Sequence, residues 1–342
     1  HGFRAQNRIS REIPLGPSSH TVVSYDPVQS RAMDKEDIRN LRRWHVAAAR
    51  RAKQAGFDLI YVYAAHGLTT PMQFLSRRYN QRTDEYGGSL ENRARLLREL
   101  IEETKEAVGD TCAVPVRICV DELADLPDLW DVTVGDWSND SRPSRFGEEG
   151  VHEEYVSFVK KITGKPVVSV GRFTSPDTMV SQVRRGVLDM VGAARPSIAD
   201  PFLPRKIEEG RLDDIRECIG CNICAAADNT YTPIRCTQNP TMGEEWRRKW
   251  HPEIITKKES EDRILIVGAG PAGMECAVSL GKRGYEVALA EAMTELGGRT
   301  AREPLLPGLS AWGRVRDYRL GQLHQLANVD IYLDSEMSAD EV

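Results

Sequence analysis

The chain has 342 residues, of which 40% are hydrophobic and 28% are charged, so it is long enough to bury a large core and to form two domains. A formal net charge of −5 gives no sign of binding to nucleic acid or to a membrane surface. No run of about 18 apolar residues is present, so we expect no membrane-spanning helix. We find no signal peptide, and the cysteines fit a reducing compartment, so we expect a cytoplasmic location.

The N-terminal third combines an irregular segment with two helical patterns. Residues 1–33 are rich in proline, serine and arginine and predict a long loop. Apolar residues then recur at helical spacing over residues 34–56, where Gly56 is placed to end the helix. A second helix is predicted over residues 89–108.

Five short apolar runs, most of them separated by helical patterns, predict a parallel sheet that is either open or closed. The runs cover residues 58–66, 114–121, 129–136, 165–173 and 188–196. The first four end in His66, Asp121, Asp136 and Arg172, and Arg195 follows the apolar part of the fifth. Polar residues gathered at strand C-termini are what the active site of a (β/α)₈ barrel requires.

This predicted α/β barrel departs from the complete pattern in two ways. Only five of the eight strands are found, so we expect about three strands to be missing before His1. Only seven residues separate Asp121 from Leu129, whereas a parallel crossover needs a dozen or more, so one helix is expected to be absent.

Four cysteines lie close together, at Cys218, Cys221, Cys224 and Cys236. A CxxCxxC run followed by a more distant cysteine is iron–sulfur spacing, most simply that of one [4Fe–4S] cluster. A structural zinc site and unrelated core cysteines remain as alternatives, although zinc sites more often use two CxxC pairs. An iron–sulfur centre would imply electron transfer.

The last 80 residues predict a nucleotide-binding fold. An apolar strand from Arg263 leads into Gly268, Gly270 and Gly273, and a helix and a second strand ending in Glu291 follow. The glycines permit a tight turn and close approach to a pyrophosphate, and Glu291 is placed to bind ribose hydroxyls. We therefore expect a site for ADP or an FAD- or NAD-type dinucleotide, in a Rossmann-like domain that is cut short after one βαβ unit.

Together these patterns predict three segments. Residues 1–210 would form a partial barrel, residues 211–262 the cysteine segment and a linker, and residues 263–342 the partial nucleotide-binding domain.

Several motifs resemble those of the flavin- and iron–sulfur-containing amine dehydrogenases, which include trimethylamine, dimethylamine and histamine dehydrogenases. The motifs are RTDEYGGSLENRARLLRE at residues 82–99, VGRF, ARPSIADPFLP at residues 194–204, CIGCNIC, CTQNP and GAGPAG. The resemblance implies a TIM barrel that binds FMN, a [4Fe–4S] cluster, an ADP-binding domain, a homodimer and an electron-transfer flavoprotein as acceptor. It also implies oxidation of a small amine to an imine that hydrolyses.

The resemblance further implies roles for individual residues. Tyr63 and His66 match the family's catalytic pair, Asp140 the carboxylate that orients the histidine, and Trp137 an aromatic wall. Asp228 lies where trimethylamine dehydrogenase has a tryptophan. A carboxylate there suits a small primary amine or a substrate with a second positive group, and histamine dehydrogenase resembles this chain at that position.

Four further residues match flavin and phosphate contacts of the same family: Arg117, Gly171, Arg172 and Arg195. Two other interpretations stay open. The wider old-yellow-enzyme superfamily includes enoate and 2,4-dienoyl-CoA reductases that use NAD(P)H, and the short connection after Asp121 would also fit an inactive fragment or degenerate paralogue.

Overall fold

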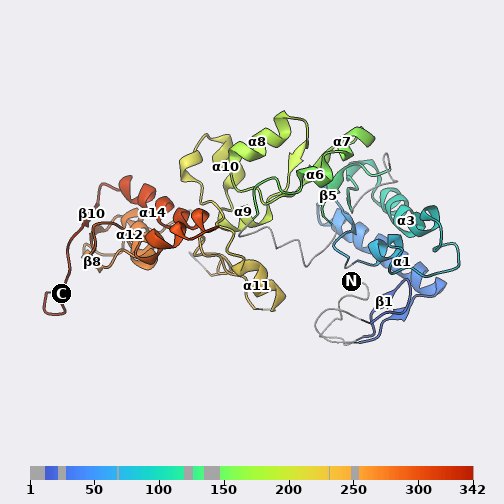
Figure 1. Ribbon diagram of the computed structural model, residues 1–342, viewed down its shortest axis with the longest axis horizontal. Coiled ribbons are helices and arrows are strands. Elements are labelled where there is room, and N and C mark those ends of the chain that lie inside the picture. Colours follow the sequence, from blue (N-terminus) through green and yellow to red (C-terminus); the bar gives the residue numbers. More distant parts are fainter. Residues whose placement is uncertain are drawn as a thin grey trace. The chain divides into compact units, whose positions relative to one another are not determined.

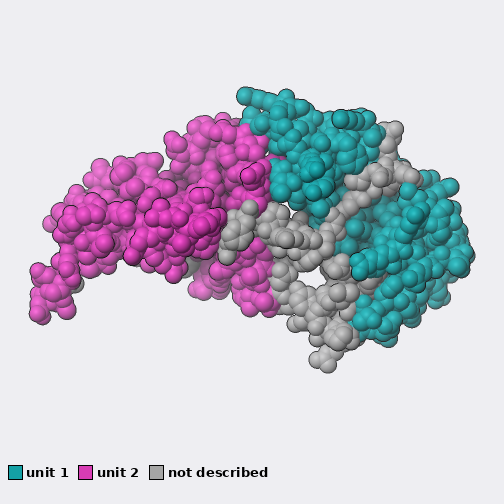
Figure 2. Space-filling model, viewed as in Figure 1, with its two compact units in different colours: residues 1–140, 150–171, 179–192 teal, residues 141–149, 172–178, 193–342 magenta. Residues whose placement is uncertain are grey.

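The computed structural model describes residues 12–21, 28–67, 69–118, 126–134, 147–230, 232–247 and 254–341, with the side chains of residues 228 and 229 excepted (Figure 1). The chain divides into two compact units, coloured in Figure 2. Unit 1 contains residues 1–140, 150–171 and 179–192, and unit 2 contains residues 141–149, 172–178 and 193–342. Within the described ranges, no helix is both long and apolar enough to cross a bilayer.

Unit 1 is organised around one parallel sheet of five strands. The strands are β3 (Val62–Ala64), β4 (Val116–Ile118), β5 (Trp130–Val132), β6 (Val167–Ser169) and β7 (Met190–Val191). Their spatial order is the order of the sequence, β3-β4-β5-β6-β7, and every pair is parallel. This confirms the five predicted strands, each shorter than its apolar run.

One face of this sheet forms the core of unit 1. Val62, Val116, Trp130 and Val167 are register partners across four strands and are fully buried. Residues two positions further along the first three strands are equally buried, as expected for a face covered by helices. Residues 119–129 connect β4 to β5, and their described part, residues 126–129, contains no helix.

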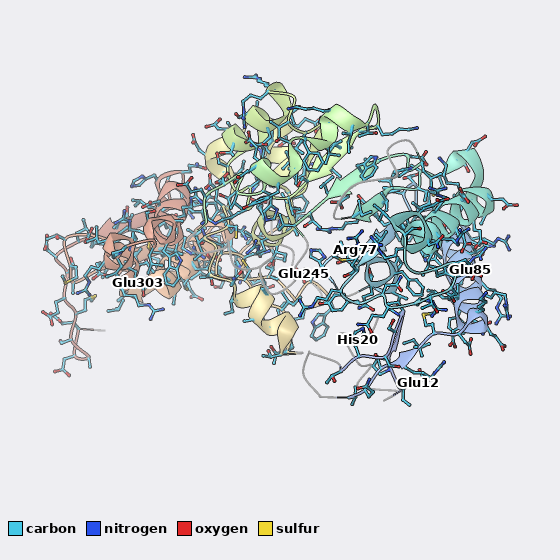
Figure 3. The ribbon with its side chains drawn as sticks, turned by 45° about the vertical axis from the view of Figure 1, so that its right-hand side comes forward. Glu12, His20, Arg77, Glu85, Glu245 and Glu303 are labelled. Atoms are coloured by element: carbon cyan, nitrogen blue, oxygen red, sulfur yellow. The ribbon has the colours of Figure 1, made fainter. Side chains whose placement is uncertain are left out.

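The helices of unit 1 begin where the sequence offers capping side chains. Helix α1 (Lys35–Gln54) is capped by Asp34, whose carboxylate accepts from Asp37 N while Asp37 caps in return. Ser89 accepts from Asn92 N at the start of α3 (Leu90–Val108). Both predicted helices are therefore confirmed. Glu85, labelled in Figure 3, forms an ion pair with Lys35 at 2.7 Å.

Smaller elements complete this part of the chain. They are β1 (Leu15–Gly16), β2 (Arg31–Ala32), α2 (Thr70–Leu75), the 3₁₀ turn η1 (Gly109–Thr111), α6 (Glu153–Val156) and α7 (Val159–Ile162). Helix α8 (Pro176–Arg184) carries residues of both units.

The C-terminal part of unit 2 has the predicted strand–helix–strand order. It comprises β8 (Arg263–Val267), α12 (Pro271–Arg283), β9 (Glu286–Ala290), α13 (Arg299–Arg302), η3 (Glu303–Leu305), η4 (Ser310–Gly313), α14 (Arg314–His324) and β10 (Val329–Tyr332). The strands form a parallel sheet in the order β10-β9-β8. Met274 and Ala277 of α12 pack with Leu289 and Leu323 in its core, so α12 and α14 lie against the sheet (Figure 1).

The rest of unit 2 contains short helices and the cysteine segment. These helices are α9 (Ala194–Ala199), α10 (Leu203–Glu208), η2 (Leu212–Asp214) and α11 (Ile223–Asn229). A fully buried ion pair joins them: Lys206 Nζ lies 2.9 Å from Asp200 Oδ2. Asp200 also accepts from Arg216 N at 2.9 Å, so the pair fixes the start of the cysteine segment.

Replacing one partner of this pair should destabilise unit 2. We expect Lys206→Met to lower the free energy of unfolding by about 3–5 kcal/mol, because Asp200 would keep a buried charge without its counter-ion. Urea denaturation measures the change. Lys35→Met, which breaks the exposed ion pair with Glu85, is the matched control and should lower the free energy of unfolding far less. Equal losses in the two variants would contradict the expectation.

Candidate functional site

The predicted catalytic pair lies at the end of β3. Tyr63 is the middle residue of the strand, and His66 follows two residues after its end. His66 is buried and has a φ of +61°, a conformation that is rare for a residue other than glycine. This turn brings the imidazole back to the strand, where Nδ1 forms a hydrogen bond with the Tyr63 hydroxyl. The structure therefore brings these two predicted residues together, with ring centroids 5.7 Å apart.

Strand register adds two charged residues to the same face. Tyr63 is the partner of Arg117 on β4, and Arg117 is the partner of Asp131 on β5. Residues opposite one another on adjacent strands point to the same side of the sheet. Arg117 Nε lies 3.7 Å from Asp131 Oδ2. Tyrosine, arginine and aspartate thus form one row across three strands.

The guanidinium of Arg117 retains hydrogen-bonding capacity. Its Nε is buried and donates no hydrogen bond to any part of the protein that the structure describes. A buried donor without an acceptor is costly, and a ligand that supplies an acceptor would remove that cost. This fits the predicted contact between Arg117 and the flavin.

Asp131 is a site residue that the motifs did not identify. Burial raises the pKa of its carboxyl, and the nearby charges of Arg117 and His66 act to lower it. The signal in the sequence is a single carboxylate inside the apolar run LWDVTV. A carboxylate is seldom buried without a charged partner, so its position in an apolar run predicts that a cationic side chain lies nearby.

Some predicted residues cannot be placed in this way. Trp137 and Asp140, together with the strand-end residues Asp121 and Asp136, lie outside the described residues. Asp228 belongs to α11, but its side chain is not among those that the structure describes. Gly171 is described, and its carbonyl accepts a hydrogen bond from Gly150 N at 2.8 Å.

Three arginines of unit 2 influence one another near Cys218. Arg172 has a φ of +60°, and burial lowers its pKa, while Glu149 and Cys218 act in the opposite direction. The positive charges of Arg314 and Arg195 lower it further. Arg172 and Arg195 were both predicted, and the structure adds Arg314 to them. The concentrated positive charge suits an anionic group such as a phosphate.

The four predicted cysteines gather in unit 2. Burial raises the pKa of the Cys218, Cys224 and Cys236 thiols, and neighbouring cysteines add to the rise. Gly220 N donates to Cys218 Sγ and Gln238 N to Cys236 Sγ, each at 3.4 Å. No cysteine within the described ranges forms a disulfide.

Whether this donor set fits an iron–sulfur cluster depends on how far the sulfurs must converge. In the described ranges, no group of three or more histidine, cysteine or acidic side chains surrounds a single-ion position. A [4Fe–4S] cluster binds each thiolate to a different iron, so its four sulfurs need not meet at one point. Four neighbouring thiols with N–H groups directed at two of them fit such a cluster, whose sulfur ligands commonly accept hydrogen bonds.

The glycine-rich loop has the close packing that its motif predicts. Gly268 has a φ of +93°, and a Cβ on Gly273 would lie 1.9 Å from Gly268 O. The carboxylate of Glu291 accepts from Ala269 N at 2.7 Å and from Met293 N at 3.0 Å. Glu291 therefore holds the loop, and its carboxylate has lone pairs left to accept further hydrogen bonds, as the predicted ribose contact requires.

Comparison with known proteins identifies the family. Residues 5–127 and 121–214 match the NADH:flavin oxidoreductase / NADH oxidase family. The chain belongs to this family. Residues 266–328 match the NAD(P)-binding Rossmann-like domain. The two matches confirm the predicted flavoprotein barrel and the Rossmann-like character of the C-terminal part. The two parts of the first match overlap at residues 121–127, within the segment between β4 and β5.

The predicted resemblance to amine dehydrogenases is also confirmed. Dimethylamine dehydrogenase of Hyphomicrobium sp. (strain x) is 44% identical over 93% of this chain and 47% of its own length. The structure of histamine dehydrogenase from Rhizobium sp. 4-9 is 56% identical, with a TM-score of 0.94 over 99% of this chain and 52% of its own. That of 6-hydroxypseudooxynicotine amine oxidase from Pseudomonas geniculata N1 is 55% identical, with a TM-score of 0.95 over 100% of this chain and 54% of its own. The chain thus spans about half the length of these relatives.

The charge of Arg117 should control the ionisation of Asp131. Arg117→Met removes an opposite charge that lowers the pKa of Asp131, so we expect this pKa to rise further above its ordinary value. When the pKa of a carboxyl is higher in the folded state than in the unfolded state, the protonated carboxyl favours the folded state. This stabilisation is fully present below the unfolded-state pKa of about 3.9, and it is lost as the pH rises through the folded-state pKa.

Relative to wild type, the variant should therefore lose stability as the pH rises above about 4, because the folded state releases the proton of Asp131 at a higher pH than the unfolded state does. Urea denaturation at several pH values measures this loss. Asp131→Asn added to Arg117→Met should remove this pH-dependent part. A difference that is independent of pH would show that Arg117 does not act on Asp131.

Proposed function

We propose that this chain is part of an amine dehydrogenase that oxidises the CH–NH bond of a small amine. The observation that carries the proposal is the identity of 55% and 56%, over nearly all of this chain, with two structures named for acting on amines. The hydrogen-bonded Tyr63–His66 pair, next to Arg117 and Asp131, supplies side chains suited to that reaction.

The reaction separates into electron, proton and water steps. A primary amine R–CH₂–NH₂ that loses two electrons and two protons becomes the imine R–CH=NH, and addition of water gives an aldehyde and ammonia. When bound, FMN supplies the two-electron acceptor and a [4Fe–4S] cluster a carrier of single electrons. The Tyr63 hydroxyl and His66 can hold the substrate nitrogen and take its proton, since they form one hydrogen-bonded pair.

The cofactors would be held by residues already described. Arg117, Gly171, Arg172 and Arg195 would bind FMN, with Arg117 supplying a fixed positive charge to its ring. The four cysteines would bind the cluster. Gly268, Gly270, Gly273 and Glu291 would bind ADP or an FAD- or NAD-type dinucleotide at the start of α12.

The proposal also covers the choice of substrate, the electron acceptor and the oligomeric state. Asp140 would orient His66, and Trp137 and Asp228 would shape the substrate site. The carboxylate of Asp228 favours a small primary amine or a substrate with a second positive group, such as histamine, over a bulky tertiary amine. Electrons would leave to an electron-transfer flavoprotein, and the protein would act as a cytoplasmic homodimer.

A second candidate is an NAD(P)H-dependent enoate or dienoyl-CoA reductase. It is favoured by the matched family, which is that of NADH:flavin oxidoreductases, and by the NAD(P)-binding Rossmann-like match over residues 266–328. The two functions differ in which molecule reduces the flavin.

An anaerobic absorbance spectrum distinguishes them. We expect histamine to bleach the flavin band of the purified protein, trimethylamine to do so more slowly, and NADPH to leave it unchanged, because the reductant should be an amine. Bleaching by NADPH and by neither amine would favour the reductase, and a protein that binds no flavin would contradict both.

Tyr63 should be needed for the reductive step. Tyr63→Phe removes the hydroxyl that bonds to His66 and should slow flavin reduction by amine by about 10²-fold or more, as measured by stopped flow. Tyr155→Phe removes an exposed hydroxyl on α6 and should leave the rate unchanged. An unaffected rate in Tyr63→Phe would exclude its catalytic role.

The cysteine assignment is tested by iron and sulfide analysis. The wild-type chain should hold about four iron and four sulfide, and Cys236→Ser should lose most of both because one iron loses its thiolate. Cys276→Ser, which changes an exposed cysteine of α12, should retain them. Retention of one zinc ion in place of iron and sulfide would favour the structural-zinc alternative.

A further inference from the structure

Gln238 ties together the two stretches that supply the cysteines. It is buried, and its N–H donates to Cys236 Sγ at 3.4 Å. Its Nε2 donates to Glu217 O, next to Cys218, at 3.2 Å, and to Arg314 O at 3.3 Å. The side chain thus joins Cys236, the residue before Cys218 and the first residue of α14.

Arg319 holds Gln238 from the nucleotide-binding side. This arginine of α14 is 4% exposed, and its Nη1 donates to Gln238 Oε1 at 3.0 Å and to Val315 O at 2.9 Å. Its Nε lies 2.8 Å from Glu275 Oε2 in an ion pair. Glu275 lies on α12, two residues after Gly273, so one guanidinium joins the cysteine segment to the helix that carries the glycine-rich loop.

A second connection joins the other end of α12 to the cysteine segment. Lys282, in the last turn of α12, donates to Gln322 Oε1 at 2.5 Å. Gln322 Nε2 donates to Asp214 Oδ1 at 2.8 Å, four residues before Cys218. Four residues before Gln322 in α14, the ring of Tyr318 lies beneath the Arg216 guanidinium, 5.3 Å from its central carbon. Helix α12 is therefore linked through α14 at both of its ends.

We propose that Arg319 couples the nucleotide site to the cysteine centre, so that an ADP-containing nucleotide acts as an effector of that centre. A nucleotide phosphate at the start of α12 would restrain the helix that bears Glu275, and Arg319 would pass the restraint to Gln238 and Cys236. Whichever of the nucleotide and the cluster binds first would order the contacts of Arg319 with Glu275 and Gln238, so the other ligand would bind more tightly. This proposal rests on the proposed function, which supplies the nucleotide and the cluster.

Thermodynamic linkage makes the coupling measurable from the nucleotide side. If cluster binding and nucleotide binding share the Arg319 contacts, each must strengthen the other by the same factor. We expect the cluster-loaded chain to bind ADP about fivefold to tenfold more tightly than the cluster-free chain, within the usual range for such coupling. A residue that only supported the fold would weaken ADP binding equally in both forms.

The experiment titrates ADP calorimetrically into cluster-loaded and cluster-free protein, for wild type and for variants. In Arg319→Gln the ratio of the two Kd values should fall towards one, because only the connection through Lys282, Gln322 and Asp214 remains. Glu275→Gln, which breaks the ion pair at a partly exposed residue, should reduce the ratio even if Arg319→Gln folds poorly. Arg263→Gln, at the exposed start of β8, is the matched control and should keep the wild-type ratio.

Equal Kd values in both wild-type forms would overturn the coupling while leaving the proposed function intact. A ratio that survives in Glu275→Gln and in Arg319→Gln would overturn the role of Arg319. Wild-type protein that binds no ADP, or that holds no iron and sulfide, would overturn both this proposal and the corresponding part of the proposed function. Bleaching of the flavin by an amine is independent of all these outcomes.

Discussion

The alternation of side chains along parallel strands is the constraint on which unit 1 depends. Every second residue of β3, β4 and β5 is apolar and fully buried, so one face of the sheet removes its apolar surface from water, which stabilises the fold. The positions between them are thereby free to carry Tyr63, Arg117 and Asp131 in a single row. A shift of one residue in any pairing would exchange the two faces and turn Tyr63, Arg117 or Asp131 toward the apolar core, so the core and the candidate site are set by the same register.

Much of this arrangement was predictable because local chemistry determines it. Asp34 and Ser89 begin helices at the expected residues, and the five apolar runs become the five strands of the sheet. The motif Tyr63-x-x-His66 also proved sufficient to place its two side chains together. Asp131 was missed because the sequence does not reveal which face of a three-residue strand a side chain occupies, nor that an arginine on the neighbouring strand lies opposite.

Contacts between distant parts of the chain were the hardest to predict. Arg314, Arg319 and Gln322 have the spacing and polarity of an exposed helix face, yet they bind residues of the cysteine segment. Glu291 was expected to face a ribose, and it also accepts two backbone N–H groups that shape the loop. In each case the partner lies more than 20 residues away in the sequence, except for Met293, which follows Glu291 by two residues.

The division of the chain into units has a consequence for how the protein can be dissected. The boundaries fall after residues 140, 149, 171, 178 and 192, so the second unit is assembled from three separate stretches of sequence. No single cut therefore yields both units whole, and an expression fragment that starts at residue 193 would lack Arg172 and Thr174. Recombination between relatives by one crossover meets the same obstacle, since any junction before residue 193 divides at least one unit. A junction within residues 141–192 divides both units, and a junction beyond residue 193 still divides unit 2, so exchange of parts between such proteins would favour a junction outside residues 141–192.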